Sequence, residues 1–213
     1  MVRLEEGGNW KNAIKYEIGN NKVVQIQSTS DSRLLVVDTI ISSWKNAVSF
    51  YAQDGNSPGF RPAQLGALFS IKSHWIVSSE PATVVMPTGT GKTETMIATV
   101  ASEMIGRTLI VVPSNLLRKQ TADKFLTFGI LQEIGIIKDT ALKPTVTTLR
   151  KTPKELSHLQ EILNRSNIVV TTMSLVQRFS EEYLMAISET CDTLIVDEAH
   201  HIAANTWATV KYK

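Results

Sequence analysis

The chain has 213 residues, 43% of them hydrophobic, which is enough to bury the core of one α/β domain with some additional structure. Its 22 basic and 20 acidic residues give a net charge of +2, too small for charge alone to indicate nucleic-acid or membrane binding. The single cysteine excludes an internal disulfide framework, and no apolar run is long enough to cross a bilayer, so we expect a cytoplasmic protein without a membrane partner.

The first 57 residues predict a small β-containing extension. Residues 15–18 and 22–27 flank Gly-Asn-Asn at 19–21, which is typical of a β-hairpin, and residues 33–38 resemble a third strand. Residues 39–53 have apolar side chains near one helical face, and the polar, glycine-rich segment 54–59 follows as a linker.

We therefore divide the chain into an extension, residues 1–57, and a main lobe, residues 58–213. In the lobe, strands and helices alternate, which predicts an α/β fold with a mostly parallel sheet flanked by helices. The expected strands are 83–86, 108–112, 145–149, 168–172 and 193–196. The expected helices are 62–72, 92–105, 115–128, 153–164 and 174–187. For the fourth helix, Thr152 is the expected cap, Pro153 the first residue and Glu155 the partner in a capping box.

A glycine-rich loop joins the first of these strands to a helix. The segment 84–98 reads VVMPTGTGKTETMIA, and apolar residues recur at helical spacing after Lys92. Such a loop presents main-chain N–H groups and a helix N-terminus to a phosphate. We expect Lys92 to reach the β- and γ-phosphates of ATP and Thr93 to bind Mg²⁺. The predicted nucleotide-binding residues of the loop are Thr88, Gly89, Thr90, Gly91, Lys92 and Thr93. Met86 departs from the glycine of the general pattern, and a glycine turn with a chance Gly-Lys-Thr is the alternative.

A pair of carboxylates follows the last predicted strand, where parallel sheets bind ligands. Asp197 is expected to hold Mg²⁺, and Glu198 to orient or deprotonate an attacking water. The alternative is an acidic helix start that complements the helix dipole. His200 and His201 would point about 100° apart on a helix, so they do not suggest a metal site.

MPTGTGKT and DEAH together resemble motifs I and II of superfamily 2 helicases and translocases, in which methionine is common at the position of Met86. The resemblance implies a RecA-like P-loop lobe with Lys92, Asp197, Glu198 and His200 as its catalytic residues. GFRPAQLGAL resembles the segment that contacts adenine, which implies roles for Arg61 and Gln64. A surface charge and a helix-capping side chain are the alternatives for these two residues.

Two further segments resemble motifs that contact nucleic acid. VVPSNLLRKQ is similar to motif Ia at Pro113 and Ser114, and VVTTMSL is similar to motif Ib at Thr171 and Thr172. Ser114 could instead be only a helix cap, and the two threonines only strand residues. Arg118 and Lys119 are expected on a solvated face.

The motifs look closer to bacterial DNA-acting members, such as restriction-enzyme translocase subunits and phage-defence helicases, than to RNA helicases. A nucleotide-dependent binding or regulatory module that does not translocate is the alternative function. Fifteen residues follow Glu198 without a motif III or a second lobe. We therefore expect a second RecA-like lobe in cis or in trans, with little ATP turnover by this chain alone.

Overall fold

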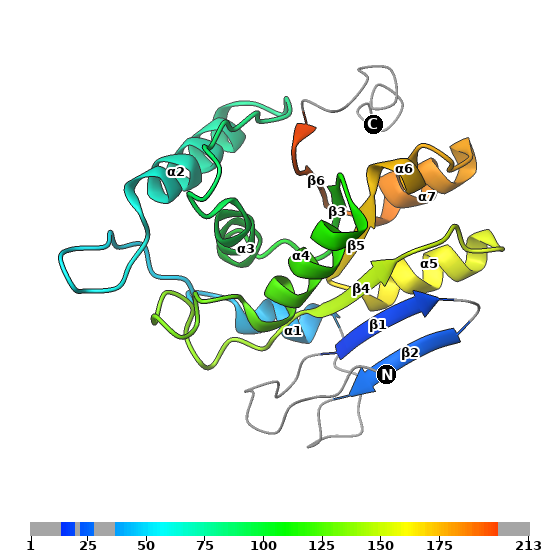
Figure 1. The fold of residues 1–213 in the computed structure, drawn as a ribbon, viewed down its shortest axis with the longest axis horizontal. Helices are drawn as coiled ribbons and strands as arrows, with labels where there is room; N and C mark the ends of the chain where they lie inside the picture. Colours follow the sequence, from blue (N-terminus) through cyan, green and yellow to red (C-terminus); the bar gives the residue numbers. More distant parts are fainter. Residues whose placement is uncertain (1–13, 20–21, 28–36, 200–213) are drawn as a thin grey trace.

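A computed structural model describes residues 14–19, 22–27 and 37–199 of the chain (Figure 1). Its centre is a six-stranded sheet with the strand order β2-β1-β4-β5-β3-β6. All neighbouring strands are parallel except β1 and β2, which form an antiparallel pair at one edge. The strands are β1 (Ile14–Gly19), β2 (Lys22–Gln27), β3 (Thr108–Val112), β4 (Thr145–Leu149), β5 (Ile168–Thr172) and β6 (Thr193–Val196).

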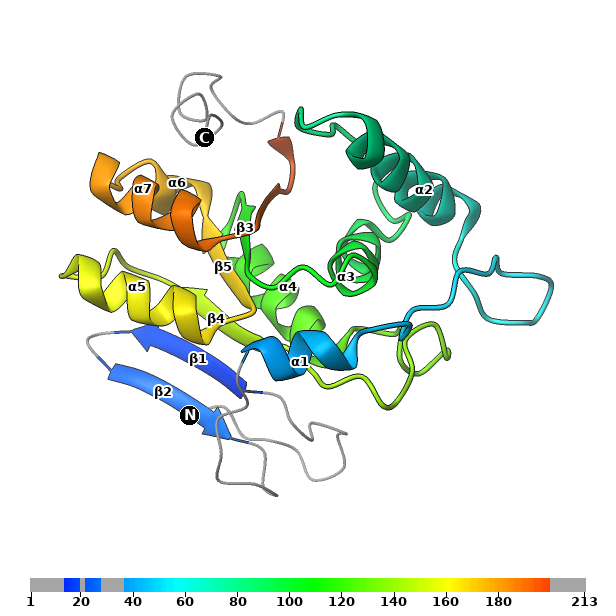
Figure 2. The same ribbon diagram turned by 180° about the vertical axis from the view of Figure 1, so that it is seen from behind.

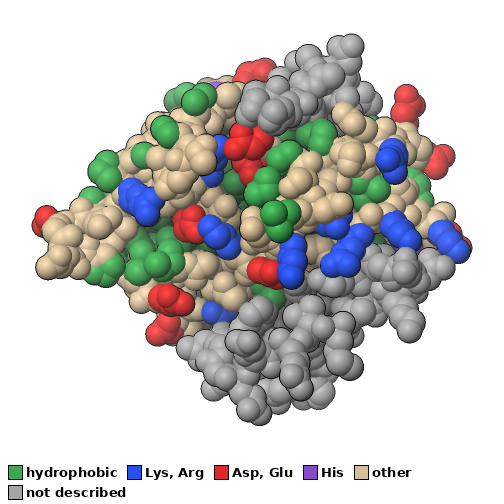
Figure 3. All heavy atoms as spheres, in the orientation of Figure 1, with side chains coloured by type: hydrophobic (Ala, Val, Ile, Leu, Met, Phe, Trp, Pro, Cys, Tyr) green, Lys and Arg blue, Asp and Glu red, His purple; other side chains and the backbone are tan. Residues whose placement is uncertain are grey.

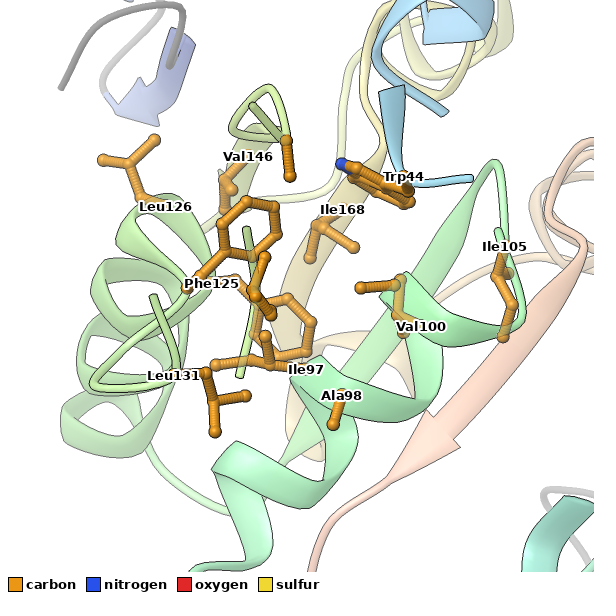
Figure 4. Packing of buried hydrophobic residues seen from close by; sticks show 14 of the residues in the cluster. Trp44, Ile97, Ala98, Val100, Ile105, Phe125, Leu126, Leu131, Val146 and Ile168 are labelled. Atoms are coloured by element: carbon orange, nitrogen blue, oxygen red, sulfur yellow. The ribbon is translucent and has the colours of Figure 1, made fainter. Parts of the chain in front are cut away.

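Helices cover both faces of this sheet, and each face has its own hydrophobic core (Figures 1 and 2). Side chains alternate along each strand, so Ile110 faces one core while Leu109 and Val111 face the other. The larger core packs Trp44, Ile97 and other apolar residues of the first four helices and of the segments that follow them against the sheet (Figure 4). The helices are α1 (Val37–Ser43), α2 (Pro62–Val77), α3 (Lys92–Ser102), α4 (Asn115–Thr127), α5 (Leu156–Arg165), α6 (Met173–Val176) and α7 (Glu181–Thr190).

The predicted α/β fold class is confirmed, as are four of the five strands expected in the lobe. The structure has them at 108–112, 145–149, 168–172 and 193–196. Their β-branched sequences are buried on both faces in β3, β4 and β5, which is what a central parallel strand requires.

The predicted N-terminal hairpin is also present, and β1 pairs in parallel with β4. The hairpin strands therefore belong to the same sheet as the lobe. The turn residues 20–21 and most of the strand predicted at 33–38 lie outside the described residues. The division of the chain at residue 57 stays a prediction.

The strand predicted at 83–86 is wrong, because residues 81–87 form no regular structure. Val84 is 40% exposed and Val85 is 91% exposed. A β-branched run becomes a strand only when a neighbour supplies hydrogen bonds along its edge. In the described residues β6 pairs with β3 alone, and its four residues are only half-buried.

Most helix predictions need correction at their ends: α2 continues to Val77 where the prediction ended at residue 72, and α3 ends at Ser102 where the prediction extended to residue 105. The helix predicted at 39–53 is α1, which begins at Val37 and ends at Ser43. Asn46 then takes a positive φ of 56°, and Val48 forms an isolated bridge with Ile137, so tertiary pairing replaces the rest of the helix. The helix predicted at 174–187 is divided into α6 and α7.

The predicted capping box at Thr152 is wrong, since α5 begins at Leu156 with Glu155 as its cap residue. The segment before it is held from another element, because the Tyr183 hydroxyl donates to the Pro153 carbonyl at 2.9 Å. Pro153 is buried there. A tertiary contact therefore overrides the local helix-start sequence.

Among the described helices, none combines the length and the apolar composition needed to cross a membrane.

Cys191, which precedes β6, supplies a test of the fold. Burial, followed by the charge of Asp192, raises the pKa of the Cys191 thiol to about 12. Because the thiolate is the nucleophile, and an unfolded cysteine has a pKa near about 8.5, we expect alkylation at about pH 8 to be slow in the native protein and fast in denaturant. Mass spectrometry of iodoacetamide-treated protein measures this directly, since the chain has one cysteine. Equal rates in native buffer and in denaturant would contradict the packing around β6.

Candidate nucleotide-binding site

The glycine-rich loop ends at the first turn of α3, as the sequence predicts. Gly91 is the N-cap residue with a φ of 92°, and Gly89 has a φ of 80°. Both angles lie in the left-handed region that favours glycine. The Thr90 hydroxyl donates to the Pro87 carbonyl at 2.6 Å and closes the turn from within. The loop leads directly into the N-terminus of α3 at Lys92. The unpaired backbone N–H groups of the first helical turn therefore lie next to the loop.

Arg61 and Gln64, at the start of α2, hold this loop from the side. Arg61 Nη1 donates to the Gly89 carbonyl at 2.6 Å, and Gln64 Nε2 donates to the Gly91 carbonyl at 3.3 Å. Gln64 Oε1 also accepts from the Arg61 backbone N–H at 2.9 Å, which confirms the capping interpretation of Gln64. A Cβ atom on Gly91 would lie 2.2 Å from Gln64 Nε2, so any other residue there would displace the Gln64 amide as well as strain the positive φ. Contact of the two side chains with adenine stays a prediction.

The carboxylates after β6 meet the loop from the opposite side. The Asp197 backbone N–H donates to the Val111 carbonyl at 2.9 Å, which extends the β3–β6 ladder by one residue. Glu198 then takes a positive φ of 54°, and its Oε1 lies 2.5 Å from Lys92 Nζ. The side chains of Lys92 and Glu198 are 28% and 30% exposed. The structure therefore brings together two sequence motifs separated by about a hundred residues.

Asp197 lies in an environment that disfavours its negative charge. Burial is the main cause that raises the pKa of the Asp197 carboxyl, and the adjacent Glu198 carboxylate raises it further. The Lys92 ammonium and a hydrogen bond from the Glu198 backbone oppose the shift. A divalent cation would remove this penalty, because it stabilises the ionised form.

For two other residues predicted to bind the nucleotide, Thr93 and Thr88, the structure shows the position and the burial. Thr93 is half-buried on the first turn of α3, and Thr88 is exposed in the loop. Their roles toward Mg²⁺ and phosphate stay predictions. His200 lies outside the described residues.

The hydroxyls predicted to contact nucleic acid are engaged within the protein. Ser114 Oγ accepts from the Leu117 backbone N–H at 3.2 Å, which confirms the capping interpretation, and Pro113 is exposed beside it. Thr171 is fully buried, and its hydroxyl donates to the Leu149 carbonyl at 3.3 Å. Thr172 is 4% exposed. Nucleic-acid contacts by these four residues stay predictions.

Sequence reasoning missed the role of Arg118. The prediction of a solvated face is correct for Lys119, which is exposed, and wrong for Arg118, which is 8% exposed. Arg118 Nη1 donates to the Leu149 carbonyl at 3.3 Å. A signal was present, because Arg118 shares its helical face with the buried Ala122 and Phe125.

Comparison with known proteins agrees with this arrangement. A family model described as "Type III restriction enzyme, res subunit" matches residues 57–213, the part of the chain that holds both motifs. A search of curated proteins finds no match. The fold, the two motifs and this match have one conclusion: the chain belongs to the type III restriction enzyme res subunit family, and it contains a superfamily 2 helicase RecA-like lobe.

Proposed function

We propose that this chain is the ATP-binding motor lobe of a nucleic-acid-dependent translocase or helicase that acts on DNA in restriction or phage defence. The observation that carries the proposal is the meeting of Lys92, at the end of the glycine-rich loop, with the Asp197-Glu198 pair at the end of β6. Membership of the res subunit family supports a helicase-like ATP-binding motor of restriction systems.

The residues present fit a nucleoside triphosphate with Mg²⁺. Gly89 and Gly91 take positive φ angles, and the space where a Gly89 Cβ would lie is open. The positive end of α3 and the Lys92 ammonium would hold the phosphates. Asp197 and Thr93 would hold Mg²⁺, which would supply positive charge to stabilise the phosphates.

Lys92 would have to exchange partners for this to happen. Its ammonium contacts Glu198 in the structure, so phosphate oxygens would compete with that carboxylate for it. Glu198 would then be released next to the reacting phosphate, where a carboxylate can orient or deprotonate water. One ion pair thus couples binding by Lys92 to the availability of Glu198.

DNA and a second RecA-like lobe, in cis or in trans, are the partners that we propose. Transition-state charge on a transferred phosphoryl group is commonly met by an arginine from outside the phosphate loop. We propose a cytoplasmic location, because proteins of a reducing compartment rarely use disulfides and the single cysteine has no disulfide partner in the sequence.

Lys92→Ala should weaken ATP binding by about 10- to 100-fold, since a hydrogen bond to a charged group contributes about 1.5–3 kcal/mol. Isothermal calorimetry with Mg²⁺·ATP measures the change. Lys72→Ala is the matched control, because Lys72 pairs with Glu103 at a similar exposure away from the loop. Equal affinities for the Lys92 variant and the parent would refute the phosphate site.

Glu198→Gln should have two opposite effects. Nucleotide affinity should rise by about 1.4- to fivefold, because the variant loses an ion pair, commonly worth about 0.2–1 kcal/mol, that competes for Lys92. ATP turnover in a complete assembly should fall by about 10²–10⁴-fold, the usual contribution of a general base. Calorimetry and phosphate release measure the two effects, with Glu103→Gln as the control. Parental turnover by the variant would remove Glu198 from the reaction.

The 213-residue chain alone should bind nucleotide and turn it over slowly, because an arginine finger from a second lobe contributes about 10³–10⁵ in rate. Phosphate release is measured with and without DNA or RNA. Turnover at about 1 s⁻¹ or faster would show that this chain works as a motor alone or completes itself by oligomerising. Nucleotide-dependent binding of a protein partner, without any stimulation by nucleic acid, would favour a regulatory module instead.

A further inference from the structure

An ion pair joins the first turn of α3 to the last turn of α4. On the face of the molecule that carries these two helices, acidic and basic side chains lie beside each other (Figure 3). Glu94 Oε1 lies 2.6 Å from Lys124 Nζ, and the side chains of Glu94 and Lys124 are 15% and 46% exposed. We propose that Lys124 is a positioning residue that neutralises Glu94 beside the phosphate loop and so preserves the attraction of the loop for phosphate. This inference rests on the proposed function and adds two residues to the nucleotide site.

The Glu94 carboxylate lies between the phosphate loop and the end of α4. Glu94 is the third residue of α3, whose N-cap is Gly91. A Cβ atom on Gly91 would lie 3.5 Å from Glu94 Oε2, so this oxygen is close to the loop backbone. A Cβ atom on Gly129, in the turn that follows α4, would lie 3.7 Å from Glu94 Oε1. The two carboxylate oxygens therefore face the two segments.

A carboxylate at this position competes with phosphate for the same positive charge. The first turn of α3 carries unpaired N–H groups and the positive end of the helix dipole. These are the groups that we propose to hold the phosphates. An unpaired Glu94 would reduce that positive potential and repel phosphate oxygens, because salt screens charges within about 8 Å of each other only in part.

The end of α4 holds the compensating charge in place. Lys124 is in the last turn of α4, and its carbonyl accepts from the Gly129 backbone N–H at 2.7 Å. Between them, Phe128 takes a positive φ of 62° and its side chain is buried. The closed and packed turn fixes the backbone from which the Lys124 side chain reaches Glu94.

An ion pair that only stabilised the two helices would respond differently to substitution. Either single change would then remove the same contact and alter nucleotide affinity in the same direction. In the proposed role the two changes have opposite signs. Loss of Lys124 leaves a negative charge beside the loop, and loss of Glu94 leaves a positive one. Removing both leaves no net charge, as the intact pair does.

Isothermal calorimetry of the full 213-residue chain with Mg²⁺·ATP measures these signs. Lys124→Gln should bind ATP about two- to tenfold more weakly, and Glu94→Gln about 1.5- to fivefold more tightly. The double variant Glu94→Gln/Lys124→Gln should bind ATP like the parent, and so should Lys124→Arg, which keeps the charge. The loss in Lys124→Gln should be larger for ATP than for ADP, because ATP carries one more negative charge, and it should shrink as salt is raised.

Two controls remove the same charge elsewhere. Lys119→Gln changes an exposed lysine on the same helix as Lys124. Lys72→Gln breaks the ion pair with Glu103 at the opposite end of α3, roughly 14 Å along the helix axis from Glu94. Both controls should keep the parental ATP affinity. A loss in Lys119→Gln as large as that in Lys124→Gln would overturn the inference, because net charge alone would then explain the effect.

Opposite changes in the two single variants, with the double variant close to the parent, would support the inference. Weaker binding by both single variants, or parental binding by both, would overturn it and leave the proposed function intact. A parent chain that binds no nucleotide, or whose affinity survives Lys92→Ala, would overturn both proposals.

Discussion

The contact between Lys92 and Glu198 is the constraint around which the lobe is arranged. An ammonium group at a helix N-terminus lies close to the positive end of the dipole, so it needs negative charge nearby. β6 supplies that charge only because its end lies beside the end of β3, where the Asp197 backbone continues the ladder. The order of strands in the sheet therefore decides which carboxylate meets the phosphate loop. Phosphate oxygens would also be attracted to the Lys92 ammonium, so they would compete with Glu198 for it.

The site also reduces the stability of the fold at Asp197. Because the pKa of this carboxyl is raised in the folded protein, mainly by burial, the folded form binds the proton more tightly than the unfolded chain does. Stability contributed by Asp197 is therefore lost as pH rises from the ordinary carboxyl range through the raised value. At neutral pH the ionised carboxyl is a cost that a cation would offset. The proposed Mg²⁺ site would account for two adjacent carboxylates at the end of the half-buried β6.

The sequence predicted the central strands well and the helix ends poorly, for physical reasons. Runs such as 108–112 and 168–172 are β-branched on both faces, so their burial in a parallel sheet depends little on context. Segment 83–86 has the same character, yet a strand also needs a paired edge, which no local pattern specifies. The start of α5 was missed because a hydroxyl on α7 holds Pro153, a contact 30 residues away in sequence. The motif residues could be singled out from the sequence because phosphate chemistry restricts both their types and their spacing, whereas the buried role of Arg118 depends on a carbonyl in another strand.

The charges at the nucleotide site support a need for a second lobe. Arg61 and Lys92 approach the loop with positive charge, while Asp197 and Glu198 approach it with negative charge. These four side chains cancel one another, and a triphosphate with one divalent cation still carries net negative charge. Because Arg61 already donates a hydrogen bond to the Gly89 carbonyl, fewer of its N–H groups are left for phosphate oxygens. The main-chain N–H groups and the helix dipole offset some of the remaining charge, but they do so equally before and during phosphoryl transfer. Selective stabilisation of the transition state would then call for a cation that arrives only in the closed state, and an arginine of the proposed partner lobe would have that property.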